Sequence, residues 1–144
     1  MIRKLPQLKN FILDIGCGEK VTNGCVGMDR RDCGQEIIWD ARDGIPFPDN
    51  SVDGICTSHF LEHLNDADSM NFLRECLRVL KHGKEMKNRL PHATSPTACW
   101  FDHQTFWNES KIESLMRITE KIEPFLITEN RQEGNELKFT LKKI

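Results

Sequence analysis

Three short apolar segments near the N-terminus, and the small gaps between them, most constrain the fold of this chain. The sequence predicts strands at residues 10–15, 25–29 and 36–40. The first ends in a glycine turn, the second in Asp29 and the third in Asp40. Only six residues separate the glycine turn from the second strand, and six the second from the third. A crossover between parallel strands usually takes a dozen or more residues, most often as a helix. We therefore expect irregular loops at both connections and a thin cover over one face of this half of the sheet.

The rest of the chain continues the alternation of strands and helices. We expect strands at 52–57 and 84–90, helices at 67–81 and 109–120, a loop at 91–104, and a hairpin of 125–127 with 137–141. Charged and apolar residues alternate along 84–90 and 137–141, which is typical of half-buried strands. These elements predict one domain, residues 1–144, with an α/β, Rossmann-like fold. Its sheet is mostly parallel with a C-terminal antiparallel hairpin, and its helix set is reduced on one face.

Composition and charge narrow the classes of function. The net charge of −2 does not indicate a nucleic-acid partner. The N-terminal apolar stretch is too short for an export signal or a membrane span, so we expect a cytoplasmic protein with no membrane partner. None of the six cysteines forms a C-x-x-C pair, which favours reduced thiols over a zinc ribbon. Apolar surface left around the first three strands would favour a homodimer through the thinly covered sheet face.

Four polar positions fall where ligands bind in such sheets, beyond the carboxyl ends of the strands. The turn Asp14 to Gly18 holds two glycines that let the backbone approach a ligand closely. A carboxylate at Asp14 repels a pyrophosphate and suits a cation, which favours S-adenosylmethionine over NAD. Asp29 can accept both hydroxyl protons of a ribose, and Asp40 can accept from an adenine amino group. Each of these acids alone also fits a solvated strand end.

The fourth polar position is a corner after the strand at 52–57. It carries Ser58, His59, Glu62 and His63. The order H-F-L-E-H lacks the second-position acid of the zinc-protease pattern H-E-x-x-H. Two histidines also need a third ligand, so the sequence predicts no metal site here.

In this order, the segments resemble class I S-adenosylmethionine-dependent methyltransferases, in particular small bacterial and phage-like members. The resemblance rests on L-D-I-G-C-G, I-P-F-P-D-N-S-V-D and L-E-H-L, and it covers residues 10–107. It implies S-adenosyl-L-methionine as cofactor and direct in-line displacement at its methyl group. The implied cofactor residues are, from the methionine end to the adenine and then the methyl side, Asp14, Gly16, Cys17, Gly18, Asp29, Arg30, Asp40, Ala41, Ser58 and His59.

The acceptor side is predicted from the loops after the fourth and fifth strands. His59, His92 and His103 are candidate bases, and Arg89 could hold a phosphate or carboxylate. Trp100 and Phe101 either stack on a base or sugar or pin the loop to the core. We expect an unidentified small-molecule or glycan-like acceptor, since no N-P-P-Y motif indicates a DNA base.

Two other functions compete with an active methyltransferase. The missing helices and the polar fifth strand, led in by His82-Gly83-Lys84 in place of the family's proline and paired glycines, favour an inactive cofactor-binding subunit that supports a partner. A nucleotide- or NAD-binding module is the third reading. Asp14 and the missing third glycine argue against it.

Overall fold

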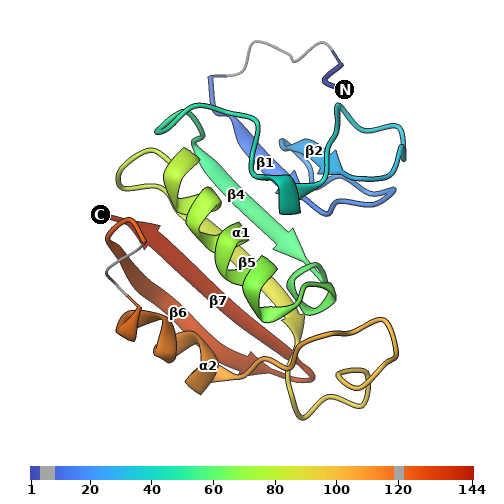
Figure 1. Cartoon of the computed structure of the whole chain (residues 1–144), viewed down its shortest axis with the longest axis vertical. Coiled ribbons are helices and arrows are strands. Elements are labelled where there is room, and N and C mark those ends of the chain that lie inside the picture. Colours follow the sequence, from blue (N-terminus) through green and yellow to red (C-terminus); the bar gives the residue numbers. More distant parts are fainter. Residues whose placement is uncertain (4–8, 119–121) are drawn as a thin grey trace.

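A single seven-stranded sheet organises the chain (Figure 1). The structure, a computed structural model, describes residues 1–3, 9–118 and 122–144. The strand order is β3-β2-β1-β4-β5-β7-β6. The strands are β1 Ile12–Ile15, β2 Val26–Asp29, β3 Ile37–Ile38, β4 Gly54–Ser58, β5 Glu85–Pro91, β6 Phe125–Glu133 and β7 Glu136–Lys143. The sequence-based α/β fold, with a parallel sheet and a C-terminal antiparallel hairpin, is confirmed.

The pairing of the strands places the polar turns at one end of the sheet. β3, β2, β1, β4 and β5 pair in parallel, so their carboxyl ends meet at the same edge. β7 runs antiparallel between β5 and β6. The direction in which successive strands are added to the sheet reverses between β1 and β4. From β1 the chain adds β2 and then β3 on one side, and it then returns to add β4 on the other side of β1. This is the switch point at which open α/β sheets bind ligands.

Helices α1 and α2 pack on the hydrophobic core of the described residues. Helix α1, Asp66–Val79, lies across β4 and β5 (Figure 1). Its Phe72, Leu73 and Leu77 are buried, as the helical spacing of apolar residues predicts. Helix α2, Glu109–Ser114, and the 3-10 turn η3, Leu115–Arg117, contribute Ile112 and Leu115 to the same core.

The opposite face of the sheet has no helix over it in the described chain. In β5, Lys87 and Arg89 are exposed, whereas Met86, Asn88 and Leu90 on the other face are buried. This confirms the half-buried pattern and the reduced helix set. Over β1 and β2, the loop at 17–25 takes the place of a helix.

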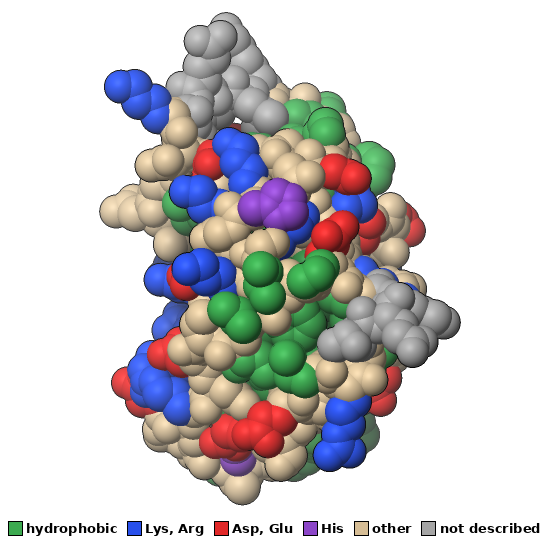
Figure 2. Space-filling model, turned by 90° about the vertical axis from the view of Figure 1, so that its left-hand side faces the viewer, with side chains coloured by type: hydrophobic (Ala, Val, Ile, Leu, Met, Phe, Trp, Pro, Cys, Tyr) green, Lys and Arg blue, Asp and Glu red, His purple; other side chains and the backbone are tan. Residues whose placement is uncertain are grey.

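The apolar surface expected around the first three strands is not found among the described residues. Asp14, Gly27 and Asp29 on that face are buried under the loops, and the bare part of the face is charged. Figure 2 shows hydrophobic side chains gathered on the side of the molecule that lies on the left in Figure 1. A homodimer through the thinly covered face stays a prediction.

Several element boundaries differ from the prediction. β3 is only two residues long, because Trp39 and Asp40 turn into the 3-10 helix η1, Ala41–Asp43. α2 ends at Ser114, and the last two residues of the expected helix at 109–120 lie outside the described chain. The hairpin is longer than expected, because charged residues continue both strands to a turn at Gly134. No described helix is long and apolar enough to cross a membrane.

A salt-bridge network on α1 holds the loop before β4. The Arg78 guanidinium donates to Glu75 at 2.8 Å, to Asp49 at 2.8 Å, and to the carbonyls of Ile45 and Phe47 at 2.9 and 3.0 Å. The bonded guanidinium holds the pKa of Glu75 below its usual range. This fixes the Pro-rich loop that follows η1 where it leads into the amino end of β4.

Candidate active site

The glycine turn after β1 is anchored on two sides. The backbone N–H groups of Gly16 and Cys17 donate to the Met28 carbonyl on β2 at 2.8 and 3.3 Å. Gly16 has φ +70°, and a Cβ there would lie 2.3 Å from Cδ2 of Phe60. Gly18 has φ +58°, and a Cβ there would meet nothing within 4 Å. The turn is thus closed toward Phe60 at its start and open at Gly18.

Asp29 joins the end of β2 to this turn. Its carboxylate accepts from Gly18 N–H and from Arg31 N–H, both at 2.9 Å, and its side chain is only 9% exposed. An ionised carboxylate offers about four lone-pair sites, so each oxygen can still accept another hydrogen bond. This geometry suits the two hydroxyls of a ribose.

Asp14 and Cys17 lie deeper than a cofactor-lining role would suggest. Asp14 is buried and accepts from Thr22 N–H at 2.7 Å, which holds the loop over the sheet. Burial, together with the charges of Asp14 and Asp29, raises the pKa of Cys17 to about 12. Asp14 supports the loop from beneath, and Cys17 is half-buried within the turn.

We expect Cys17 to resist alkylation at pH 8. With a pKa of about 12, only about one thiol in ten thousand is the reactive thiolate at that pH. Exposed Cys99 should be modified by iodoacetamide first, and Cys17 should gain reactivity only as the pH rises toward 12. Peptide mass spectrometry over a time course measures both sites. Equal rates at pH 8 would contradict the raised pKa of Cys17.

An open hollow of about 630 Å³ lies at the ends of β2 and β3. This volume is in the range of small-molecule sites. Asp40 caps η1 and pairs with Arg42 at 2.6 Å, and this pairing holds the pKa of Asp40 below its usual range. Ala41 is buried. The hollow is lined by Arg30, Arg31, Ile38, Trp39, Asp40 and Asp43.

The corner after β4 is held in an unusual backbone conformation. His59 has φ +54°, which non-glycine residues seldom adopt, and its N–H donates to the Arg89 carbonyl at 2.9 Å. The Ser58 hydroxyl accepts from the Arg89 guanidinium at 2.8 Å. The His59 ring is half exposed, and its Nε2 lies 2.9 Å from Glu136. The corner therefore presents His59 at the surface beside the strand ends.

The three candidate bases lie in different surroundings. His92 is buried with both ring nitrogens bonded, Nε2 to Glu109 at 2.9 Å and Nδ1 to Thr94 at 2.8 Å. Its position is that of a structural histidine. His59 and His103 both lie beside Glu62, which the sequence analysis did not assign to the site. Burial raises the pKa of Glu62.

The aromatic residues of the loop after β5 divide into two groups. Trp107 is buried and stacks on Phe139 at 6.2 Å between ring centroids. Trp100 and Phe101 are exposed, so they do not pin the loop to the core. Phe60 also lies at the site, against Gly16, and no periodic pattern in the sequence indicated it.

Comparisons with known proteins agree with this geometry. A family model described as a methyltransferase domain matches residues 26–86, from β2 into β5. The match covers less than half of the chain, and over these residues the chain is similar to that family. No curated protein sequence matches it at a significant level.

Solved structures share the fold of this chain at low identity. A S-adenosylmethionine-dependent methyltransferase from Archaeoglobus fulgidus has a TM-score of 0.70 at 16% identity, over 93% of this chain and 86% of its own. One from Aquifex aeolicus has 0.69 at 15%, over 94% and 82%. A methyltransferase from Haloferax volcanii, in complex with the activator Trm112, has 0.70 at 14%, over 93% and 82%. At these identities the likeness supports the fold alone.

The residues present fit S-adenosylmethionine. Gly18 leaves open space beside the turn, Asp29 keeps free lone pairs, and the hollow lies next to Asp29 through Arg30 and Arg31. Two features limit how the cofactor can bind. The Phe60 ring fills the space beside Gly16, and the Asp40 carboxylate is already paired with Arg42.

Proposed function

We propose that this chain binds S-adenosylmethionine across the ends of β1 to β4 and transfers its methyl group to a small-molecule or carbohydrate-like acceptor. The observation that carries the proposal is Asp29, whose carboxylate is fixed by Gly18 and Arg31 and still has free acceptor sites. An acid in this place accepts both ribose hydroxyls in charge-assisted hydrogen bonds.

We assign the other cofactor contacts by the place of each residue along the carboxyl edge of the sheet, relative to Asp29. Gly16, Cys17 and Gly18 would carry the methionine end, with Asp14 beneath them. Arg30, Asp40 and Ala41 would meet the adenine in the hollow. Ser58 and His59 would close the methyl side.

When bound, the cofactor supplies a methyl group on a sulfonium, which an aligned nucleophile displaces in line. The chain's main task is therefore to orient the acceptor. Among the three candidate bases, His59 has the best position, because its ring is half exposed at the β4 corner. His92 has both nitrogens bonded. A base is needed only where the acceptor must lose a proton during attack.

The surface beside the corner favours a planar or sugar-like acceptor with an anionic group. Trp100 and Phe101 are exposed and offer faces for stacking. Arg89 is exposed next to Ser58 and can pair with a phosphate or carboxylate.

The inactive-subunit alternative has lost one of its two reasons. The polar fifth strand is a full seven-residue strand, paired with β4 and β7.

The six free cysteines are typical of a protein in a reducing compartment, which supports a cytoplasmic location.

Calorimetry with S-adenosylmethionine, S-adenosylhomocysteine and NAD tests the proposal. We expect both sulfur compounds to bind and NAD not to. Radiolabelled methyl from the cofactor, offered with small-molecule and glycan fractions of a lysate, then identifies the acceptor class. Binding of NAD alone would overturn the cofactor assignment, and cofactor binding without any transfer would favour the inactive subunit.

A further inference from the structure

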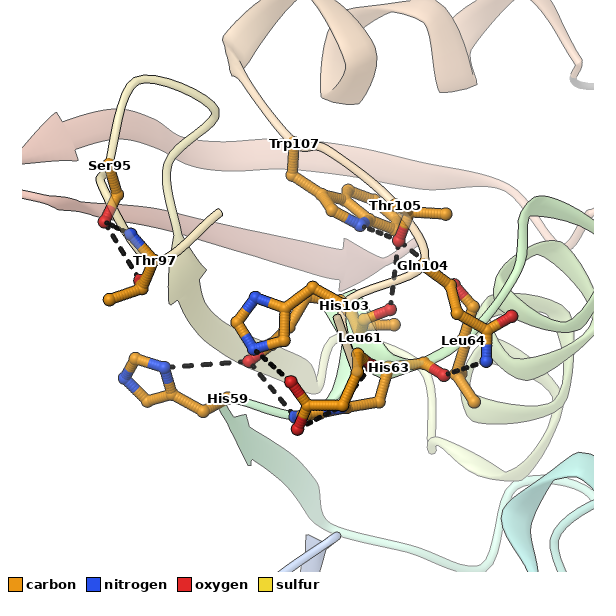
Figure 3. A network of polar contacts seen from close by, with 12 residues as sticks. His59, Leu61, His63, Leu64, Ser95, Thr97, His103, Gln104, Thr105 and Trp107 are labelled. Carbon is orange, nitrogen blue, oxygen red and sulfur yellow. Dashed lines mark hydrogen bonds and ion pairs between the residues drawn. The ribbon is translucent and has the colours of Figure 1, made fainter. Parts of the chain in front are cut away.

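Three ligand-type side chains converge beside the β4 corner, outside the cofactor contacts proposed above. Glu62 and His63 belong to the 3-10 turn η2, Leu61–His63, and His103 comes from the loop after β5 (Figure 3). One oxygen or ring nitrogen from each lies within 4.8 Å of the other two. Residues forty positions apart in the sequence thus face one point.

The Glu62 carboxylate has no hydrogen-bond partner in the described chain. The residue is 2% exposed, and neither carboxylate oxygen accepts a hydrogen bond. Burying an unpaired carboxylate costs several kcal/mol or more, so such groups are paired or coordinate a metal. The position therefore calls for a cation.

The hydrogen bond of His63 fixes which ring nitrogen faces Glu62. Nδ1 lies 3.0 Å from the Asp102 backbone carbonyl, which can only accept, so Nδ1 carries the proton. In the neutral ring Nε2 is then a bare lone pair, and it lies 3.8 Å from Glu62 Oε1. A carbonyl that orients a ligating histidine in this way is typical of metal sites.

His59 repeats the arrangement on the outer side of Glu62. Its Nε2 contacts the Glu136 carboxylate at 2.9 Å, and its Nδ1 lies 3.7 Å from Glu62 Oε1. Two imidazole nitrogens thus face the same oxygen at a separation too long for a hydrogen bond.

His103 completes the set from inside the loop. Its side chain is 6% exposed, and its Nδ1 is buried without a hydrogen-bond partner in the described chain. The next residues tie the loop to η2: the N–H groups of Gln104 and Thr105 donate to the Glu62 carbonyl at 2.7 and 3.3 Å. The backbone therefore holds the groups together without a direct bond between their side chains.

The spacing approaches that of a small tetrahedral ion, since the three ligand atoms lie within 4.8 Å of one another. Metal–ligand distances of about 2.0–2.1 Å at tetrahedral angles separate neighbouring ligand atoms by about 3.4 Å. The His63–Glu62 distance of 3.8 Å needs a shift of only a few tenths of an ångström. Nitrogen and carboxylate ligands suit Zn²⁺ and similar first-row ions over Ca²⁺ or Mg²⁺.

We propose that Glu62, His63 and His103 bind a divalent transition-metal ion of the Zn²⁺ class, with His59 or water at the fourth position. This reverses the expectation from the sequence, in which the third ligand was missing. The ion ties the loop at 91–104 to the β4 corner and thereby orders the acceptor side. None of its three ligands is a proposed cofactor contact, so metal binding can be tested without the cofactor; His59 is the residue that both proposals share.

Titration of untagged, chelator-treated protein with Co²⁺ tests the site. We expect one Co²⁺ per chain, visible d–d absorption bands of four-coordinate type, and displacement by Zn²⁺. Thermal unfolding should shift to higher temperature with Zn²⁺, because the ion binds only the folded state.

Two variants and a matched control give the test its specificity. Glu62→Gln keeps the size of the side chain, His103→Asn removes the ligand from the loop, and His82→Asn changes an exposed histidine elsewhere. We expect the first two to bind Co²⁺ at least about 100-fold more weakly, since even indirect partners of metal ligands cost 10–100-fold. The control should match the parent protein.

Binding that is absent at millimolar Co²⁺, or unchanged by Glu62→Gln, would overturn the proposal. If Co²⁺ does not bind at millimolar concentration, the cluster of Glu62, His63 and His103 holds only protons. Should His103→Asn fail to fold, as judged by circular dichroism, the isosteric Glu62→Gln carries the test alone.

Discussion

Replacing Asp29 with alanine should weaken binding of S-adenosylmethionine by a factor of about 100 to 10,000. The carboxylate would make two charge-assisted hydrogen bonds to the ribose, each worth about 1.5–3 kcal/mol. At about 1.4 kcal/mol per factor of ten, their loss gives this range. The variant also frees the Gly18 and Arg31 N–H groups, which loosens the glycine turn. Calorimetry with the cofactor and with S-adenosylhomocysteine measures the loss.

Two further variants separate the charge of Asp29 from its support of the turn. Asp29→Asn keeps an acceptor oxygen near the turn and should lie between the parent and Asp29→Ala. Asp32→Ala removes an exposed acid of the same loop that pairs with Arg3 at 2.9 Å, and should leave affinity unchanged. An Asp29→Ala protein that is folded and binds as tightly as the parent would place the ribose elsewhere.

Gly16→Ala should lower the stability of the fold by roughly 2–5 kcal/mol. A non-glycine residue in the left-handed region costs about 1–2 kcal/mol. The new methyl group would also lie 2.3 Å from Cδ2 of Phe60, whose ring packs edge-on against Phe72. Forcing extra volume into a packed site costs about 1–3 kcal/mol. Thermal unfolding by circular dichroism should show a midpoint lower by about 10 °C.

Gly18→Ala provides the matched control for steric overlap. Gly18 has a similar positive φ but open space around it, so only the conformational cost of about 1–2 kcal/mol applies. Adding Phe60→Ala to Gly16→Ala should make the two changes non-additive, because the second removes the clash. Equal destabilisation by Gly16→Ala and Gly18→Ala would show that Phe60 does not close the turn.

Local patterns were sufficient to predict the sheet and the acids at its edge. The six-residue gaps between the first three strands indicated loops in place of helices. The alternation of charged and apolar residues in 84–90 predicted a strand with one solvent-exposed face. Both follow from chain geometry that neighbouring residues determine. The end of β3 was placed two residues too late, because Asp40 caps η1 instead of continuing the strand.

Contacts between distant segments were beyond such patterns. His103 meets Glu62 only because the loop after β5 folds back and donates two backbone hydrogen bonds to η2. Phe60 meets Gly16 because β4 lies beside β1. The bonding of both His92 nitrogens depends on Glu109 at the start of α2. A single sequence carries no local signal for any of these pairs.

The bare, charged face of the sheet sets how freely this chain can change by mutation. Along β5 from Met86 to Leu90, every second side chain lies in the core and its neighbours are exposed. Substitutions at Lys87 or Arg89 disturb little packing, while those at Met86 or Leu90 open cavities. Tolerance to mutation therefore alternates residue by residue through the centre of the molecule, where a sheet covered on both faces would be intolerant throughout.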